Sequence, residues 1–128
     1  MSKPKLLIVD DQPNIRMMIR LVLRDTFELR EAADADEAGK LIAEDRPDGV
    51  VLDVMMPGTI NGFQLCEKIK RDPELAGIHV VLVTARGQVA DQELGQALGA
   101  DAYFTKPFSP LALAAHLRQA MSVEGERH

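Results

Sequence analysis

The sequence has little of several features, and each shortage excludes a class of protein. Cys66 is the only cysteine among 128 residues, which excludes an intrachain disulfide and a metal site of several cysteines. No Lys/Arg-rich run occurs, and the net charge is -5, so direct binding to nucleic acid is not expected. No apolar run approaches the ~18 residues of a membrane span, and the start is too weakly apolar for a signal peptide. We therefore expect a cytoplasmic protein that does not insert into a membrane.

Apolar runs of strand character alternate with helical patterns along the whole chain. A content of 46% hydrophobic residues in a chain of this length suits one compact domain. The five runs cover residues 5–10, 27–32, 48–53, 78–84 and 100–104. Such alternation predicts an α/β fold with parallel strands and helical crossovers. We expect a flavodoxin-like, doubly wound sheet of five strands in the order 2-1-3-4-5 with five helices, and the polar second run suits an edge strand.

Helix boundary signals agree with this alternation. Asp34 and Glu37 have the spacing of a capping box at a helix start. Ser109 followed by Pro110 predicts an N-cap with proline at the first helical position. Gly99 is placed to end the fourth helix. These signals predict where three of the helices begin or end.

Polar side chains follow the ends of the predicted inner strands. Asp10 and Asp11 end the first strand, Asp53 ends the third, Thr84 ends the fourth, and Lys106 follows the fifth. In an open parallel sheet, ligands bind beyond the carboxyl ends of the strands where the strand order reverses, here between strands one and three. The topology therefore predicts one pocket that contains all five side chains.

The predicted pocket has the chemistry of phosphoryl transfer. Three carboxylates and one ammonium total roughly -2, which raises acid pKa values unless a cation is present. Oxygen ligands of this kind favour Mg²⁺. Asp53 is then a nucleophile that needs no general base, because a carboxylate is already ionised at neutral pH. Lys106 and the cation would offset the charge of an approaching phosphoryl donor.

Four motifs carry a resemblance to a known family. They are IVDDQP (8–13), LDVMMPG (52–58), VTA (83–85) and YFTKPF (103–108), in this order. Together they resemble the receiver domain of bacterial two-component response regulators, either in a stand-alone form like the chemotaxis regulators or as a receiver taken from a longer chain. The resemblance covers nearly the whole chain, as a receiver domain at 1–122 with a short tail at 123–128.

The resemblance implies a role for each acid. Asp53 would accept a phosphoryl group from the phosphohistidine of a sensor histidine kinase or a histidine phosphotransfer protein. Asp10, Asp11, Asp53 and the main-chain carbonyl of Met55 would hold Mg²⁺ or Mn²⁺. The protein would then be a phosphoacceptor that promotes its own phosphorylation and dephosphorylation, and not an enzyme for a separate substrate.

The resemblance also implies a switch. Thr84 and Lys106 would contact phosphoryl oxygens, and the peptide bond from Lys106 to Pro107 would be cis. Thr84 would move toward the phosphoryl group while Tyr103 rotates inward, changing the surface of the fourth helix, fifth strand and fifth helix. That surface would control a downstream protein. The chain would be a monomer or a phosphorylation-dependent dimer.

Two departures from the family pattern concern the loops around the acids. Gly62 stands nine residues beyond Asp53, where the family has its glycine at eight, so the loop 57–62 is longer by one residue. Met55 and Arg86 occupy the positions that tune loss of phosphate in the family. Because Met55 cannot orient a water by a hydrogen bond, we expect a phosphoryl state that lasts for minutes or more.

Simpler structural roles remain open for several residues. Asp10 and Asp11 could cap the first helix, and Thr84 could cap the fourth. Tyr103 could be ordinary core with its hydroxyl at the surface. We expect Cys66 to be buried. The three histidines, His79, His116 and His128, match no metal spacing and are expected to be structural or solvated.

Three rival functions share part of this pattern. A haloacid-dehalogenase-type phosphatase needs a second acid two residues after its nucleophile, where this chain has Met55. A flavodoxin-like flavin carrier is disfavoured because Asp10 and Asp11 would repel the flavin phosphate. A receiver-like scaffold that binds partners without phosphorylation remains an alternative.

Overall fold

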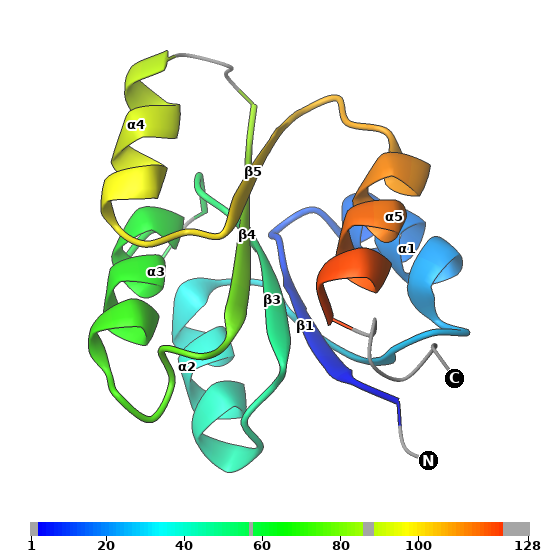
Figure 1. Ribbon diagram of the computed structural model, residues 1–128, viewed down its shortest axis with the longest axis horizontal. Coiled ribbons are helices and arrows are strands. Elements are labelled where there is room, and N and C mark those ends of the chain that lie inside the picture. Colours follow the sequence, from blue (N-terminus) through cyan, green and yellow to red (C-terminus); the bar gives the residue numbers. More distant parts are fainter. Residues whose placement is uncertain (1–2, 57, 86–88, 122–128) are drawn as a thin grey trace.

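A computed structural model describes residues 3–56, 58–85 and 89–121, which form a single five-stranded parallel sheet (Figure 1). The strands are β1 (Lys5–Val9), β2 (Glu28–Ala32), β3 (Gly49–Asp53), β4 (His79–Thr84) and β5 (Ala102–Thr105). Their order is β2-β1-β3-β4-β5, and every neighbouring pair is parallel. The predicted sheet order is confirmed, with β2 at one edge.

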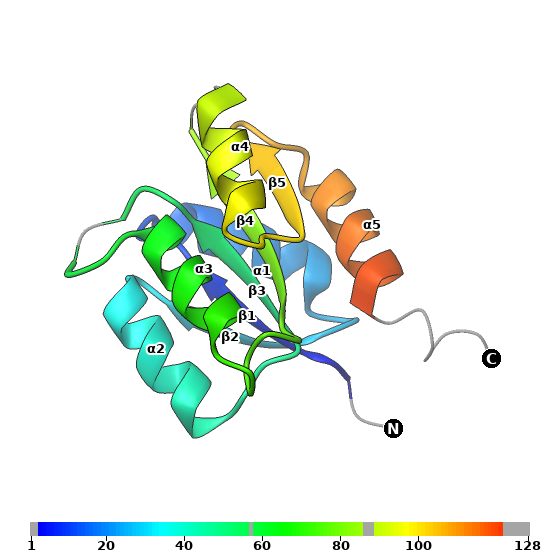
Figure 2. The same ribbon diagram turned by 60° about the vertical axis from the view of Figure 1, so that its left-hand side comes forward.

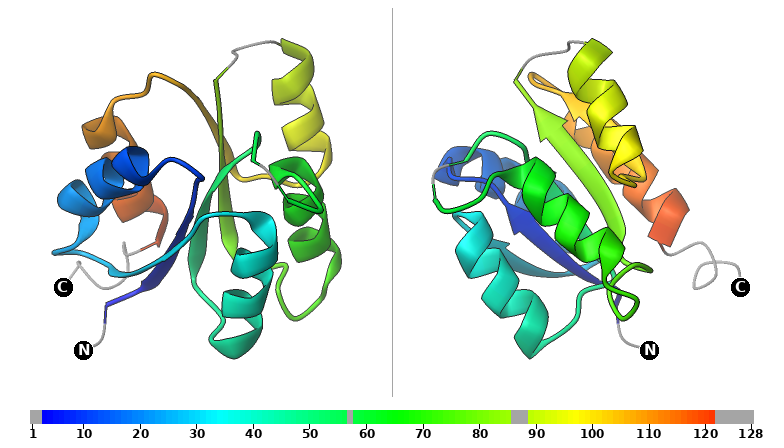
Figure 3. Two further views of the ribbon diagram at one scale, coloured as in Figure 1. Left: turned by 180° about the vertical axis from the view of Figure 1, so that it is seen from behind. Right: turned by 90° about the vertical axis from the view of Figure 1, so that its left-hand side faces the viewer.

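Five helices cover the two faces of the sheet. They are α1 (Pro13–Leu23), α2 (Ala35–Glu44), α3 (Gly62–Arg71), α4 (Val89–Ala97) and α5 (Pro110–Met121). α1 and α5 lie on one face, and α2, α3 and α4 on the other, with the sheet between them (Figure 3). None of the helices in the described part of the chain is long and apolar enough to cross a bilayer.

The side-chain alternation of the inner strands divides the core into two layers. On the α1/α5 face the strands contribute Leu6, Ile8, Val51, Val81 and Val83. On the α2/α3/α4 face they contribute Leu7, Val9, Val50, Leu52, Val80 and Leu82. Because both faces of these strands are covered, their sequences are continuously apolar, as expected of inner parallel strands. All of β3 is buried, including its terminal acid.

The predicted helix caps are largely confirmed. Asp34 is the N-cap of α2 and accepts a hydrogen bond from the Glu37 N–H at 2.8 Å. The reciprocal half of the predicted capping box is wrong, because the Glu37 carboxylate accepts from the N–H of Ala33, one residue before the cap. A complete capping box forms instead at α3, where Asn61 and Gln64 each accept from the other's N–H.

The helix and strand boundaries in the C-terminal third agree with the prediction except at the start of the fifth strand. Ser109 caps α5 by accepting from the Ala112 N–H. Gly99 has a positive φ of 95° after α4, a conformation that favours glycine. The fifth strand begins at Ala102 and not at Ala100, because the Ala100 N–H still bonds to the Gly95 carbonyl at the end of the helix.

All strands run the same way, so their carboxyl ends gather at one rim of the sheet (Figure 2). We call this edge the carboxyl rim. The peptide bond between Lys106 and Pro107, in the loop that leaves β5 at this rim, is cis.

Candidate functional site

Strand register brings the acids together at the carboxyl rim. Val9 pairs with Leu52, so the next residues along the two strands, Asp10 and Asp53, lie side by side. One carboxylate oxygen from each of Asp10, Asp11 and Asp53 lies within 4.8 Å of the others. Asp10 and Asp53 are buried, with 3% and 4% of their surface exposed, while Asp11 is exposed. The predicted meeting of the three acids is therefore present in the structure.

Lys106 reaches this cluster from the far side of β4. Thr84 pairs with Thr105, and the Lys106 N–H donates to the Thr84 carbonyl at 2.6 Å, which fixes the start of the loop after β5. The Lys106 ammonium forms ion pairs with Asp10 Oδ2 at 3.0 Å and Asp53 Oδ2 at 3.3 Å. One cation of the chain thus contacts both buried acids.

Burial dominates the electrostatics of Asp53. Removal from water raises its pKa above the usual range, and the neighbouring Asp10 carboxylate adds to this. The Met55 N–H, which donates to Asp53 Oδ1 at 3.1 Å, and the Lys106 ammonium act in the opposite direction. Burial opposes the charge of Lys106, but hydrogen bonding and attraction to Asp10 and Asp53 outweigh it and raise the pKa of Lys106. At Asp53, burial and the Asp10 charge therefore outweigh the Met55 N–H and the Lys106 ammonium.

The acid cluster is a suitable donor set for a hard divalent cation. Carboxylate oxygens are the ligands that Mg²⁺ and Mn²⁺ prefer, and three of them from two strand ends converge within one ion's reach. Asp11 is the most accessible of the three, which leaves the approach from solvent open. A cation here would favour the charged form of Asp53 and so offset the burial and the Asp10 charge that raise its pKa.

The loop after β1 is held by the first turn of α1. Gln12 is the N-cap residue of α1, and no side chain caps this helix, so the simple capping role considered for Asp10 and Asp11 is wrong. Asp10 Oδ1 instead accepts from the Gln12 N–H at 2.9 Å. Arg16 donates to the Asp10 carbonyl at 2.6 Å and is itself held by Glu31. Arg16 was not identified from the sequence.

Thr84 ends the strand next to that of Asp53, and the Tyr103 side chain lies close to Thr84. Thr84 is almost fully buried at the end of β4. Residues 86–88, between β4 and α4, lie outside the described residues, so the capping of α4 by Thr84 stays a prediction. The Tyr103 hydroxyl is also buried, and it has no well-formed hydrogen bond within the described residues. Burial raises the pKa of Tyr103, and the neighbouring Thr84 side chain opposes this. The tyrosine hydroxyl thus points into the protein toward Thr84, and not to the surface.

Gly62 packs directly against the main chain of the strand that carries Asp53. It is the first residue of α3, and its N–H donates to the Val54 carbonyl at 3.2 Å. A Cβ at this position would lie 2.7 Å from Val54 Cα and closer still to the Asp53 carbonyl oxygen. The glycine is therefore required by close approach, and the additional loop residue is accommodated before it.

The longer loop also contacts α2. The Thr59 N–H donates to Asp36 Oδ2 at 3.3 Å, in the first turn of that helix. Pro57 in this loop, Arg86 after β4, and the predicted tail at 123–128 lie outside the described residues.

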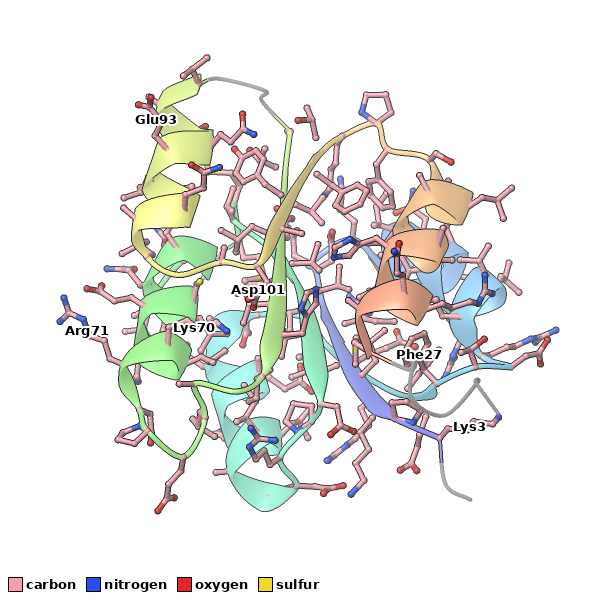
Figure 4. All side chains as sticks on the ribbon, viewed as in Figure 1. Lys3, Phe27, Lys70, Arg71, Glu93 and Asp101 are labelled. Carbon is pink, nitrogen blue, oxygen red and sulfur yellow. The ribbon has the colours of Figure 1, made fainter. Side chains whose placement is uncertain are left out.

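A second polar cluster, which the sequence did not indicate, lies away from the carboxyl rim. His79 Nε2 and His116 Nε2 are 2.9 Å apart and join β4 to α5. Asp101 forms an ion pair with Lys70 at 2.8 Å, and both are labelled in Figure 4. A surface depression of about 630 Å³ adjoins His79, Lys70 and Asp101. His79 and His116 are 37 positions apart, which matches no motif spacing. Their pairing is therefore seen only in the structure, where α5 packs on the sheet.

Comparisons with known proteins agree with the fold and the motifs. A model of the family described as response regulator receiver domain matches residues 6–118. The phosphate regulon transcriptional regulatory protein PhoB of Pseudomonas aeruginosa is 39% identical over 121 residues, covering 94% of this chain and 52% of that protein. The DNA-binding response regulator MtrA of Mycolicibacterium smegmatis is 38% identical, covering 91% and 50%. The chemotaxis protein CheY4 of Vibrio cholerae matches with a TM-score of 0.84 at 29% identity, covering 92% and 98%.

The chain spans about half the length of the curated relatives that it matches. Several of these are named as transcriptional regulators, and one as DNA-binding. The prediction of a stand-alone regulator is therefore not confirmed, and the prediction of no direct nucleic-acid partner is not supported. The family match over most of the chain, together with the fold, identifies this protein as a member of the response regulator receiver domain family.

Proposed function

We propose that the chain is a phosphorylation-activated signalling switch that accepts a phosphoryl group on Asp53. The donor would be a sensor histidine kinase or a histidine phosphotransfer protein. The observation that carries this proposal is the buried Asp53 carboxylate, in contact with the Lys106 ammonium and beside two further acids. The nucleophile, the ammonium that offsets its charge and the ligands for a cation then lie in one small pocket.

The environment of Asp53 suits nucleophilic attack. Its Oδ1 accepts from the Met55 N–H and its Oδ2 faces Lys106, which fixes the plane of the carboxylate. In the proposed step an Asp53 oxygen bonds to phosphorus while the phosphorus–nitrogen bond of the donor's phosphohistidine breaks. The imidazole leaves with the electron pair and takes up a proton. The Lys106 ammonium would balance charge on the transferred group.

Asp10, Asp11, Asp53 and the Met55 carbonyl are the groups that we propose to hold Mg²⁺ or Mn²⁺. Such an ion supplies charge neutralisation for phosphoryl oxygens beside the acids. The remaining contribution of the chain is positional: Arg16 and the Gln12 N–H fix Asp10 beside the nucleophile.

The buried hydroxyls of Thr84 and Tyr103 are the proposed route from the site to the surface. Thr84 is the last residue of β4, and Tyr103 lies against Gly95 of α4. A phosphoryl group on Asp53 would offer new acceptors to the Thr84 hydroxyl. A change in the Thr84 position would then alter the packing of Tyr103 and with it the α4, β5 and α5 surface. That surface would control a partner protein or an output domain of a longer chain.

The proposal is tested by phosphorylation with acetyl phosphate. Purified protein is incubated with labelled acetyl phosphate with and without Mg²⁺, and the stable incorporation is measured. We expect Mg²⁺-dependent label in wild type and in Asp25→Asn, a matched control at an exposed aspartate in the turn after α1. We expect no label in Asp53→Asn.

Label in Asp53→Asn equal to wild type would overturn the assignment of the nucleophile. No label in wild type, together with no spectral response to beryllofluoride and Mg²⁺, would favour a receiver-like scaffold that works without phosphorylation.

A further inference from the structure

Gln12 contacts both partners of the central ion pair. Its main-chain N–H donates to Asp10 Oδ1 at 2.9 Å, while Asp10 Oδ2 binds the Lys106 ammonium at 3.0 Å. Its side-chain carbonyl, Oε1, lies 3.3 Å from the same ammonium. Gln12 thus closes a ring of contacts around the acid and the lysine, although Gln12 and Lys106 are 94 residues apart in the sequence.

Within the part of the chain that the structure describes, the Lys106 ammonium has as many hydrogen-bond acceptors as it has hydrogens. A lysine ammonium has three donors and no acceptor. Those of Lys106 face Asp10, Asp53 and Gln12. A phosphoryl oxygen can therefore bind the ammonium only if one of these acceptors is released.

The three acceptors are not equally easy to release. Asp10 is charged, buried and the nearest of them to the ammonium, and Asp53 carries the transferred group itself. Gln12 is neutral and exposed, so water can replace the lysine as its partner. The amide is the acceptor whose loss costs least.

We infer that Gln12 is a positioning residue for Lys106, and this rests on the proposed function. Its side-chain carbonyl holds the ammonium between Asp10 and Asp53 before the donor arrives. It is also the acceptor that Lys106 exchanges for a phosphoryl oxygen. The Gln12 side chain touches neither the donor nor the cation in this role, and it acts only through the lysine.

The test compares Gln12→Leu with Asn14→Leu in the full chain. Both changes replace an exposed amide by leucine at the start of α1, and only Gln12 contacts Lys106. With acetyl phosphate and Mg²⁺, we expect Gln12→Leu to lower the phosphorylation rate constant about threefold to tenfold, the effect of one net hydrogen bond. We expect Asn14→Leu to match wild type.

Two further readouts separate positioning from a general structural effect. The dissociation constant for Mg²⁺, measured without donor, is expected to stay within about twofold of wild type in Gln12→Leu, because the Gln12 side chain is not a proposed ligand. The Lys106 ¹⁵Nζ resonance, assigned by its loss in Lys106→Arg, is expected to shift and broaden in Gln12→Leu and to stay unchanged in Asn14→Leu.

An unchanged Lys106 resonance and an unchanged rate constant in Gln12→Leu would overturn the role of Gln12 while the proposed function stands. Failure of the wild type to become phosphorylated would instead reject the proposed function. In that case the Lys106 resonance, recorded without donor, still decides the contact with Gln12. A circular dichroism spectrum like that of wild type confirms that each variant is folded.

Discussion

Replacing Gly62 by alanine should disturb both the fold and the strand that carries Asp53, the proposed phosphoacceptor. The added Cβ would lie 2.7 Å from Val54 Cα, and its other close neighbours are the carbonyl carbon and oxygen of Asp53. These are main-chain atoms of the buried residues Asp53 and Val54, at the end of β3, so no flexible side chain can give way. Overpacking of this kind costs about 1–3 kcal/mol of unfolding free energy. The clash moves Asp53, the proposed nucleophile, so phosphorylation should slow as well.

Gly39→Ala is the matched control. Gly39 lies inside α2, and a Cβ there would meet no atom within 4 Å. Alanine is better than glycine in a helix interior by about 0.5–1 kcal/mol, so this variant should be stabilised. The chain has no tryptophan, so urea unfolding is followed by far-ultraviolet circular dichroism. A Gly62→Ala protein as stable as wild type, or shifted in the same direction as Gly39→Ala, would refute the argument from close approach.

Three other predictions follow from single contacts. Burial lowers the pKa of His79, so its contribution to stability is present above about pH 6.5 and is lost as the pH falls through the lowered folded value. The free energy of urea unfolding should therefore fall less on acidification in His79→Gln than in wild type. An equal fall in the two proteins would contradict this. Burial raises the pKa of Cys66 to about 11, so its alkylation at pH 8 should be at least about tenfold slower in folded than in urea-unfolded protein; equal rates would mean an accessible thiolate. Asn61→Ala removes the acceptor for the Gln64 N–H and should cost about 1 kcal/mol in urea unfolding, whereas an unchanged midpoint would show that the α3 cap is dispensable.

The arrangement of the acids was predictable because it depends on strand order more than on side-chain detail. Apolar runs place Asp10 and Asp53 at the ends of two inner strands, and parallel pairing then puts them at the same rim. Lys106 follows for the same reason, since any residue just beyond β5 lies at that rim. The five strands and the sheet order required only periodicity and length.

Features that depend on side-chain geometry or close packing were not predictable. The contact of Gln12 with Lys106 depends on where two long side chains lie, and no spacing rule relates them. The His79 and His116 pair arises from the way α5 packs on the sheet. The sequence indicated only that Gly62 lies one residue later than in the family pattern. The structure shows that a side chain at this position would clash with the main chain of Asp53 and Val54.

Chemical mapping of the phosphorylated residue tests the central claim most directly. An acyl phosphate on aspartate is reduced by borohydride to the alcohol, which converts the residue to homoserine and marks its position in a peptide digest. After treatment with acetyl phosphate and Mg²⁺, the account predicts homoserine at Asp53, and none when the divalent cation is removed by chelation. Homoserine at another aspartate, or equal conversion of Asp53 without the cation, would contradict it.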